Sequence, residues 1–131
     1  MCWFENLKMR NDRDNIIVNL SFKFALNIVV FCETLEEQKK YTIARQLIKS
    51  GTSIGANIRE AQNAESKNDF IHKFKIAAKE VDETYYWLEI CKEIKTYPFD
   101  QSLIDELDSI SRIINKIISS SKISKTLPSS N

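Results

Sequence analysis

The chain contains one histidine, His72, and one acid-x-x-His step that could belong to a metal site. Asp69 precedes His72 by three residues, which is the spacing found in di-iron carboxylate bundles. Such a centre needs two of these steps and further inward carboxylates, and a single histidine cannot supply them within one chain. We therefore predict no metal site. We expect His72 on the solvated face of its helix, because Phe70 and Phe74 take the inward face.

Three cysteines, Cys2, Cys32 and Cys91, are the other candidates for reactive chemistry. They follow no CxxC or metal-ligand spacing, and Cys32 and Cys91 have apolar neighbours, a setting in which thiols are usually inert. A nucleophile would also need a histidine base and a glycine-rich elbow, whereas Gly51 and Gly55 lie within a helical pattern. The sequence therefore predicts a protein that is not an enzyme and has no catalytic residue or cofactor.

Length and composition indicate one small helical domain. The 131 residues include only two Gly and two Pro, too few turn residues for a many-stranded sheet. The formal charge of +1 means that any electrostatic function must depend on how charge is distributed. Residues 16–32 are strongly apolar, but the polar stripe of Asn19, Lys23 and Asn27 favours a buried helix over a membrane anchor. The odd cysteine count and the lack of a secretory signal predict a cytoplasmic protein.

Apolar periodicity and capping signals predict four helices. The first helix runs from a cap at Asp14 or Asn15 to about Leu35, and the second runs from after the Glu36-Glu37 turn to about Ala64. The third begins at the Ser66 cap, with Asp69 three residues later, and runs to about Ile94. The fourth runs from Asp100 or Ser102 to about Ile123. Short connectors then predict an all-α, antiparallel up-down-up-down four-helix bundle. We expect residues 1–14 to form an N-terminal extension, residues 15–124 the bundle, and residues 125–131 a flexible tail.

The predicted core positions step by three and four along each helix. They are Ile17, Leu20, Phe24, Ile28, Phe31 and Leu35, then Ala44, Leu47, Ile48, Gly51, Ile54, Ile58 and Ala61, then Phe70, Phe74, Ala77, Val81, Leu88 and Cys91, and finally Leu103, Leu107, Ile110, Ile114 and Ile117. A second apolar stripe lies beside the first on the opening helix: Val18, Phe22, Ala25, Val29 and Cys32. Since one bundle core does not require both stripes, we predict an oligomer interface at Val18, Phe22 and Val29.

Charge is segregated along the third and fourth helices. Lysines precede acids in the third helix, and acids precede basic residues in the fourth, so antiparallel packing makes one end of the bundle basic. The candidate nucleic-acid-binding residues at that end are Arg59, Lys67, Lys75, Lys79, Arg112 and Lys116. Binding of phosphates there would depend on salt. An ordinary solvated surface that steers subunits is the alternative interpretation, and the two carry equal weight.

The segment from Arg45 to Ala61, RQLIKSGTSIGANIREA, resembles the hallmark of the four-helix bundle proteins encoded in 23S rRNA intervening sequences. Residues 66–70 and the later Glu83-Thr84 and Trp87-Leu88 pairs are similar to the third helix of that family. The resemblance covers the chain from about residue 15 to about residue 122.

This resemblance implies a bacterial cytoplasmic protein whose relatives form pentameric rings. A more distant similarity, to the accessory variability determinant of diversity-generating retroelements, implies a pentamer that engages nucleic acid and a reverse transcriptase. Many family members are clearly basic, and this nearly neutral chain departs from that pattern. In the hallmark segment Ser53, Asn57 and Glu60 share one helical face, which we interpret first as a polar network that fixes helix contacts and second as a ligand site.

Two functional hypotheses follow from the sequence. In the first, the protein is a non-enzymatic homopentamer that binds RNA, another nucleic acid or an RNA-associated protein through its basic ends. In the second, the ring is a structural or protein-interaction scaffold without nucleic-acid binding. Neither hypothesis involves a membrane.

Overall fold

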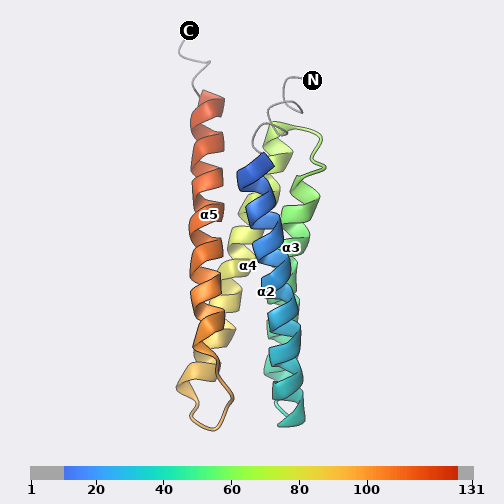
Figure 1. Ribbon diagram of the computed structural model, residues 1–131, viewed down its shortest axis with the longest axis vertical. Helices are drawn as coiled ribbons and strands as arrows, with labels where there is room; N and C mark the ends of the chain where they lie inside the picture. Colours follow the sequence, from blue (N-terminus) through green and yellow to red (C-terminus); the bar gives the residue numbers. More distant parts are fainter. Residues whose placement is uncertain (1–10, 127–131) are drawn as a thin grey trace.

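The computed structural model describes residues 11–126, which form four α-helices and contain no β-strand. The helices are α2 (Asn11–Glu37), α3 (Tyr41–Ala61), α4 (Lys67–Glu93) and α5 (Gln101–Thr126). In Figure 1, α2 descends from the upper end, α3 ascends, α4 descends and α5 ascends. The predicted all-α fold with four helices is confirmed. Residues 1–10 and 127–131 lie outside the described residues, as does most of the extension and of the tail predicted there.

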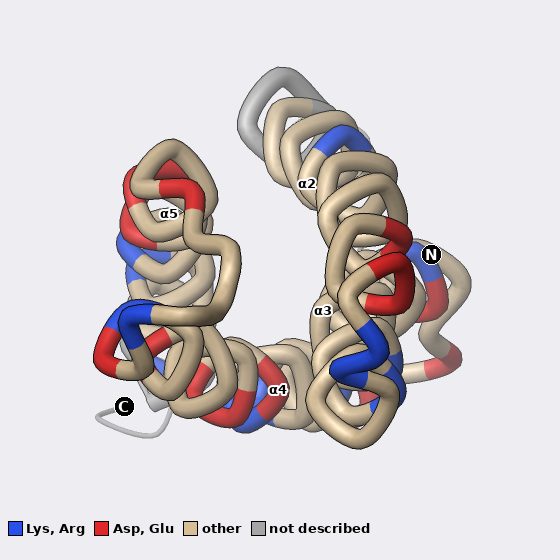
Figure 2. Tube along the Cα trace, turned by 90° about the horizontal axis from the view of Figure 1, so that it is seen from below, with Lys and Arg blue, Asp and Glu red and all other residues tan. Residues whose placement is uncertain are grey.

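Each helix packs against the helix that precedes it in the chain, and α5 also contacts α2. Figure 2 shows from below that α2, α3, α4 and α5 follow one another in a U-shaped arc, with α2 and α5 at its two ends. This order brings the beginning of α4 and the end of α5 together at the upper end of the bundle (Figure 1). The same order places the beginning of α5 beside the end of α4 at the lower end.

Local capping interactions set several helix ends. The Ser66 hydroxyl accepts a hydrogen bond from the backbone N–H of Asp69 at 3.0 Å, and the Asp69 carboxylate accepts one from the backbone N–H of Glu65 at 3.3 Å. This is the acidic capping box expected at the start of α4. Asp100 caps α5 in a similar way, because its carboxylate accepts from both the N–H and the hydroxyl of Ser102.

Several helix boundaries differ from the sequence prediction: α3 begins only at Tyr41, and α5 runs to Thr126, three residues past the expected Ile123. α2 begins at Asn11, before the expected cap at Asp14 or Asn15, because residues 11–14 include no proline or glycine that would stop the helix. α3 ends at Ala61, earlier than the expected Ala64. Residues 62–64 form turns in which each backbone N–H donates to the carbonyl three residues earlier. The last turn is therefore wound more tightly than an α-helix, which explains the earlier helix end.

The glycine- and serine-rich middle of α3 is a continuous helix, as expected. Thr52 and Ser53 each donate a side-chain hydrogen bond of 2.6 Å to the carbonyl four residues earlier, which occupies hydroxyl groups that could otherwise compete with the helix. Gly51 and Gly55 lie against α2. A Cβ atom at Gly51 would lie 2.9 Å from Cγ2 of Ile28, and one at Gly55 would lie 3.2 Å from the backbone oxygen of Ser21. The glycines therefore allow α2 and α3 to approach closely.

Apolar side chains from all four helices fill the core, and the predicted seams of α4 and α5 are buried throughout. Two predicted core positions were wrong, since Leu20 and Ile48 are each 36% exposed. Leu20 lines a hollow of about 220 Å³ between α2 and α5. Ile48 is rotated about 100° around α3 from Leu47, which takes the inward position instead.

The core also contains a polar contact that the apolar pattern did not predict. Thr84 of α4 is fully buried, and its hydroxyl lies 2.7 Å from the carbonyl oxygen of Glu80, to which it can donate. The same hydroxyl lies 3.0 Å from the hydroxyl of Ser50 of α3, which is also fully buried. Ser50 also reaches the carbonyl of Leu47. The pair satisfies its own hydrogen-bonding groups while linking α3 to α4.

Candidate nucleic-acid and oligomer interfaces

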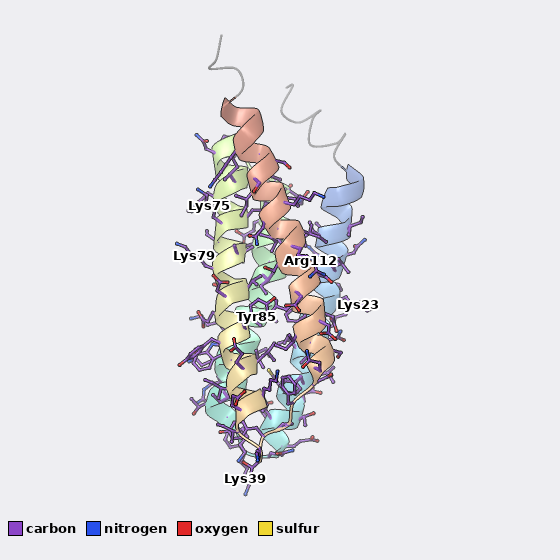
Figure 3. The ribbon with its side chains drawn as sticks, turned by 90° about the vertical axis from the view of Figure 1, so that its left-hand side faces the viewer. Lys23, Lys39, Lys75, Lys79, Tyr85 and Arg112 are labelled. Carbon is purple, nitrogen blue, oxygen red and sulfur yellow. The ribbon has the colours of Figure 1, made fainter. Side chains whose placement is uncertain are left out.

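A continuous part of α4 and α5 carries basic residues and no acids. Between Asp69 and Glu80 the α4 sequence contains no carboxylate, and after Asp108 the chain contains none at all. These two stretches come from neighbouring helices and end together at the upper end of the bundle. Four exposed cations define what we call the α4–α5 basic surface: Lys75, Lys79, Arg112 and Lys116. Figure 3 shows Lys75 and Lys79 on α4 and Arg112 on α5.

The structure separates Arg59 from this surface. Arg59 lies on the side of α3 that faces α2, where its guanidinium stands 5.3 Å from the ring centre of Phe22. It also lines a groove of about 300 Å³ between these two helices. Lys67 is half-buried at the first position of α4, above the four exposed cations. Four of the six predicted nucleic-acid-binding residues therefore lie on the exposed α4–α5 basic surface, and Arg59 lies on the α2–α3 side.

A hollow of about 190 Å³ opens in this part of the molecule, between the first turns of α4 and the last turns of α5. It is lined by Asn68, Ile71, His72, Lys75 and Lys122. His72 is exposed, as expected from its position opposite the inward Phe74. The sequence pattern did not indicate that His72 and Lys122 share a hollow, because they are 50 residues apart in the chain.

The polar residues of the hallmark segment bond mainly to their own helix. Asn57 donates from Nδ2 to the carbonyl of Ser53 at 2.8 Å, and Ser53 donates to the carbonyl of Lys49. Glu60 is different, because its carboxylate forms an ion pair of 2.9 Å with Lys73 of α4. Among the bonds that these three side chains form with described residues, the Glu60–Lys73 ion pair joins α3 to α4, and the other two side chains bond within α3.

The aromatic triplet of α4, Tyr85, Tyr86 and Trp87, lies beside carboxylates. The Tyr85 hydroxyl donates to the carboxylate of Asp108 on α5 at 2.5 Å, and burial together with this hydrogen bond raises the pKa of Tyr85. Tyr86 is exposed and packs edge-on against Trp87, whose indole N–H donates to Glu83. Carboxylates next to these rings give this half of α4 a local negative charge.

An apolar surface covers the outer side of α2. Four large apolar side chains are exposed there, which we call the α2 apolar surface: Phe22 at 49%, Leu26 at 51%, Val29 at 37% and Val30 at 62%. Two of the three predicted interface residues, Phe22 and Val29, belong to it, and the third, Val18, is half-buried in the adjoining groove. Sequence reasoning missed Leu26 and Val30. The available signal was spacing: Leu26 follows Phe22 by four residues, and Val30 follows Leu26 by four.

Both described thiols are buried. Burial raises the pKa of Cys32 to about 12 and that of Cys91 to about 11, so both remain protonated at neutral pH. Among residues 11–126, no group of three or more His, Cys, Asp or Glu side chains could hold a metal ion.

The apolar segment Ile16–Glu37 of α2 is long and apolar enough to cross a membrane, a test that core helices of soluble proteins also pass. In this bundle, Ile17, Phe24 and Ile28 of α2 are fully buried against the other helices. Asn27 donates to Glu106 of α5 at 2.9 Å. These contacts are those of a core helix.

Comparison with known proteins agrees with this fold. The model of the 23S rRNA-intervening sequence protein family matches residues 13–116, and the chain belongs to this family. One similar solved structure is a protein of unknown function from the S23 ribosomal protein family of Bacteroides thetaiotaomicron. It is 40% identical, covers 82% of this chain and 98% of its own, and has a TM-score of 0.76. No curated protein matches the chain. The family resemblance predicted from the hallmark segment is confirmed.

Proposed function

We propose that the protein is a non-enzymatic, RNA-associated oligomer that binds phosphates through its α4–α5 basic surface. The observation that carries this proposal is the absence of carboxylates from two neighbouring stretches that together carry Lys75, Lys79, Arg112 and Lys116. A phosphate that contacts these cations releases counterions. The nearest acids, Glu80, Asp82 and Asp108, border the surface. The basic surface is local, which explains how a chain of formal charge +1 can still bind nucleic acid.

The subunit in this proposal is an antiparallel up-down-up-down bundle that assembles into a homopentameric ring in the bacterial cytoplasm. The α2 apolar surface supports the oligomer, because four large apolar side chains exposed on one helix are what a second subunit would cover. A ring would also repeat the α4–α5 basic surface. Several weak patches that engage one RNA together give an apparent affinity far above that of a single patch.

Charge reversal tests the proposed RNA surface. We expect the double variant Lys75→Glu and Lys79→Glu to abolish binding to a structured fragment of ribosomal RNA at low salt, measured by fluorescence anisotropy. The matched control is Lys92→Glu and Lys95→Glu, which changes the charge equally at exposed positions of the lower end. Equal losses in the two double variants would refute a specific surface, and undiminished binding by the first variant would refute the proposal.

The second candidate function is a protein-interaction scaffold, and the α2 apolar surface is the observation that favours it. A partner bound there would remain bound at high salt, because apolar contacts are not screened. A complex that resists high salt and is lost on changing Leu26 to Glu, with no RNA bound at low salt, would support the scaffold over the RNA-associated protein.

A further inference from the structure

The hollow between α4 and α5 gathers side chains that can donate hydrogen bonds to an anion. Lys75 and Lys122 contribute ammonium groups, His72 contributes an imidazole and Asn68 an amide, while Ile71 forms the apolar side of the hollow. These groups come from two helices and surround a space of about 190 Å³. Cations and neutral donors around one hollow are the donor set that suits a phosphate group.

The titratable and charged side chains that line the hollow are His72 and Lys75 of α4 and Lys122 of α5. The nearest carboxylate in the sequence, Asp69, is engaged at the helix cap, where it accepts from the N–H of Glu65. Lys73 lies on the other side of α4 and pairs with Glu60 of α3.

We infer that this hollow is a phosphate site for the backbone of the bound RNA. The inference rests on the proposed RNA association and specifies its contact point. Lys75 and Lys122 supply cationic donors from two helices, and the His72 ring supplies an N–H donor.

The first experiment measures binding of a labelled single-stranded RNA to the full chain. We expect His72→Ala to weaken binding about two- to fivefold, the range expected for one exposed polar contact. The control Asn19→Ala, at an exposed position of α2, should bind as the wild type does. Wild-type affinity in His72→Ala would overturn the inference.

The second experiment follows the imidazole signals of His72 by NMR, since one histidine gives one set of ring signals. Both the RNA and inorganic phosphate at matched ionic strength should displace these signals, and Lys75→Gln should reduce the displacement. RNA binding that leaves the His72 signals unmoved would overturn the hollow as its phosphate site while leaving the proposed function intact. Displacement by phosphate with no RNA binding would support the hollow as a free-phosphate site and refute the RNA association.

Discussion

At the scale of single residues, Tyr85 and Tyr86 show how neighbours in sequence acquire different roles. Tyr85 is half-buried between α4 and α5 and donates to Asp108 at 2.5 Å, whereas Tyr86 is 59% exposed. Both are tyrosines in the same turn of one helix. Because their surroundings differ, Tyr86 can serve as the control when the contribution of the Tyr85 hydroxyl to stability is measured.

Removing the Tyr85 hydroxyl should destabilise the bundle. We expect Tyr85→Phe to lower the free energy of unfolding by about 1 kcal/mol, because the partly buried Asp108 carboxylate loses a hydrogen-bond donor. Urea denaturation measures the change. The control Tyr86→Phe should have an effect below about 0.5 kcal/mol, as is usual at exposed positions. Similar losses for the two variants would contradict the assigned role of the Tyr85–Asp108 bond.

The buried thiols should make the protein less stable in alkaline solution. Burial raises the pKa of Cys32 to about 12 and of Cys91 to about 11, above the value of about 8.5 expected in an unfolded chain. A raised folded-state pKa gives stability that is fully present below about pH 8.5 and is lost as the pH rises toward the folded-state values. We therefore expect the free energy of unfolding to fall between about pH 8.5 and about pH 10, by at most about 1.4 kcal/mol per thiol and pH unit.

Urea denaturation across this pH range checks the thiol prediction. The double variant Cys32→Ala and Cys91→Ala should show a flatter dependence of stability on pH, even though it is less stable at neutral pH because of the volume removed from the core. An unchanged slope in the double variant would mean that other groups cause the alkaline loss.

At the scale of elements, the sequence predicted the number of helices and most of their inward faces. Apolar residues at steps of three and four identified the buried seams of α4 and α5, and the Ser66–Asp69 capping box identified the start of α4. The pattern could not place flank residues such as Leu20 and Ile48. Whether a flank position is buried depends on how closely the neighbouring helix approaches, which periodicity within one helix does not encode.

The close approach of α2 and α3 should depend on Gly51. A Cβ atom there would lie 2.9 Å from Cγ2 of Ile28, a fully buried side chain. Alanine gains about 1 kcal/mol in helix propensity over glycine, but overpacking of a core typically costs about 1–3 kcal/mol. We expect Gly51→Ala to be less stable than wild type by up to about 2 kcal/mol in urea denaturation. A variant more stable than wild type would show that Ile28 can move aside at little cost.

At the scale of the whole molecule, the candidate site was only partly predictable. Charge segregation along α4 and α5 identified Lys75, Lys79, Arg112 and Lys116, because neighbouring helices of opposite direction bring the relevant halves together. Arg59 lies on the α2–α3 side, and the hollow around His72 depends on how α5 meets α4. Such pairings across the bundle arise from packing geometry, which a single sequence does not display.

The α2 apolar surface should hold subunits together. We expect light scattering at micromolar concentration to give a mass near five times the 15.2 kDa of one chain. Val30→Glu, at the most exposed of the four apolar side chains, should shift the population toward monomers, because a charge cannot be buried unpaired in an apolar interface. The control Ile94→Glu, at an exposed apolar position near the lower end of α4, should leave the mass unchanged. A monomeric wild-type protein would contradict the oligomer.

The salt dependence of RNA binding tests the central claim most directly. For a single-stranded RNA, the slope of the logarithm of the binding constant against the logarithm of the salt concentration is about −0.7 per phosphate contacted. If Lys75, Lys79, Arg112 and Lys116 of one subunit each neutralise one phosphate, the slope should be about −3 or steeper, and charge reversal at Lys75 and Lys79 should make it shallower. No binding at low salt, or a slope near zero, would contradict the assignment of the α4–α5 basic surface to RNA.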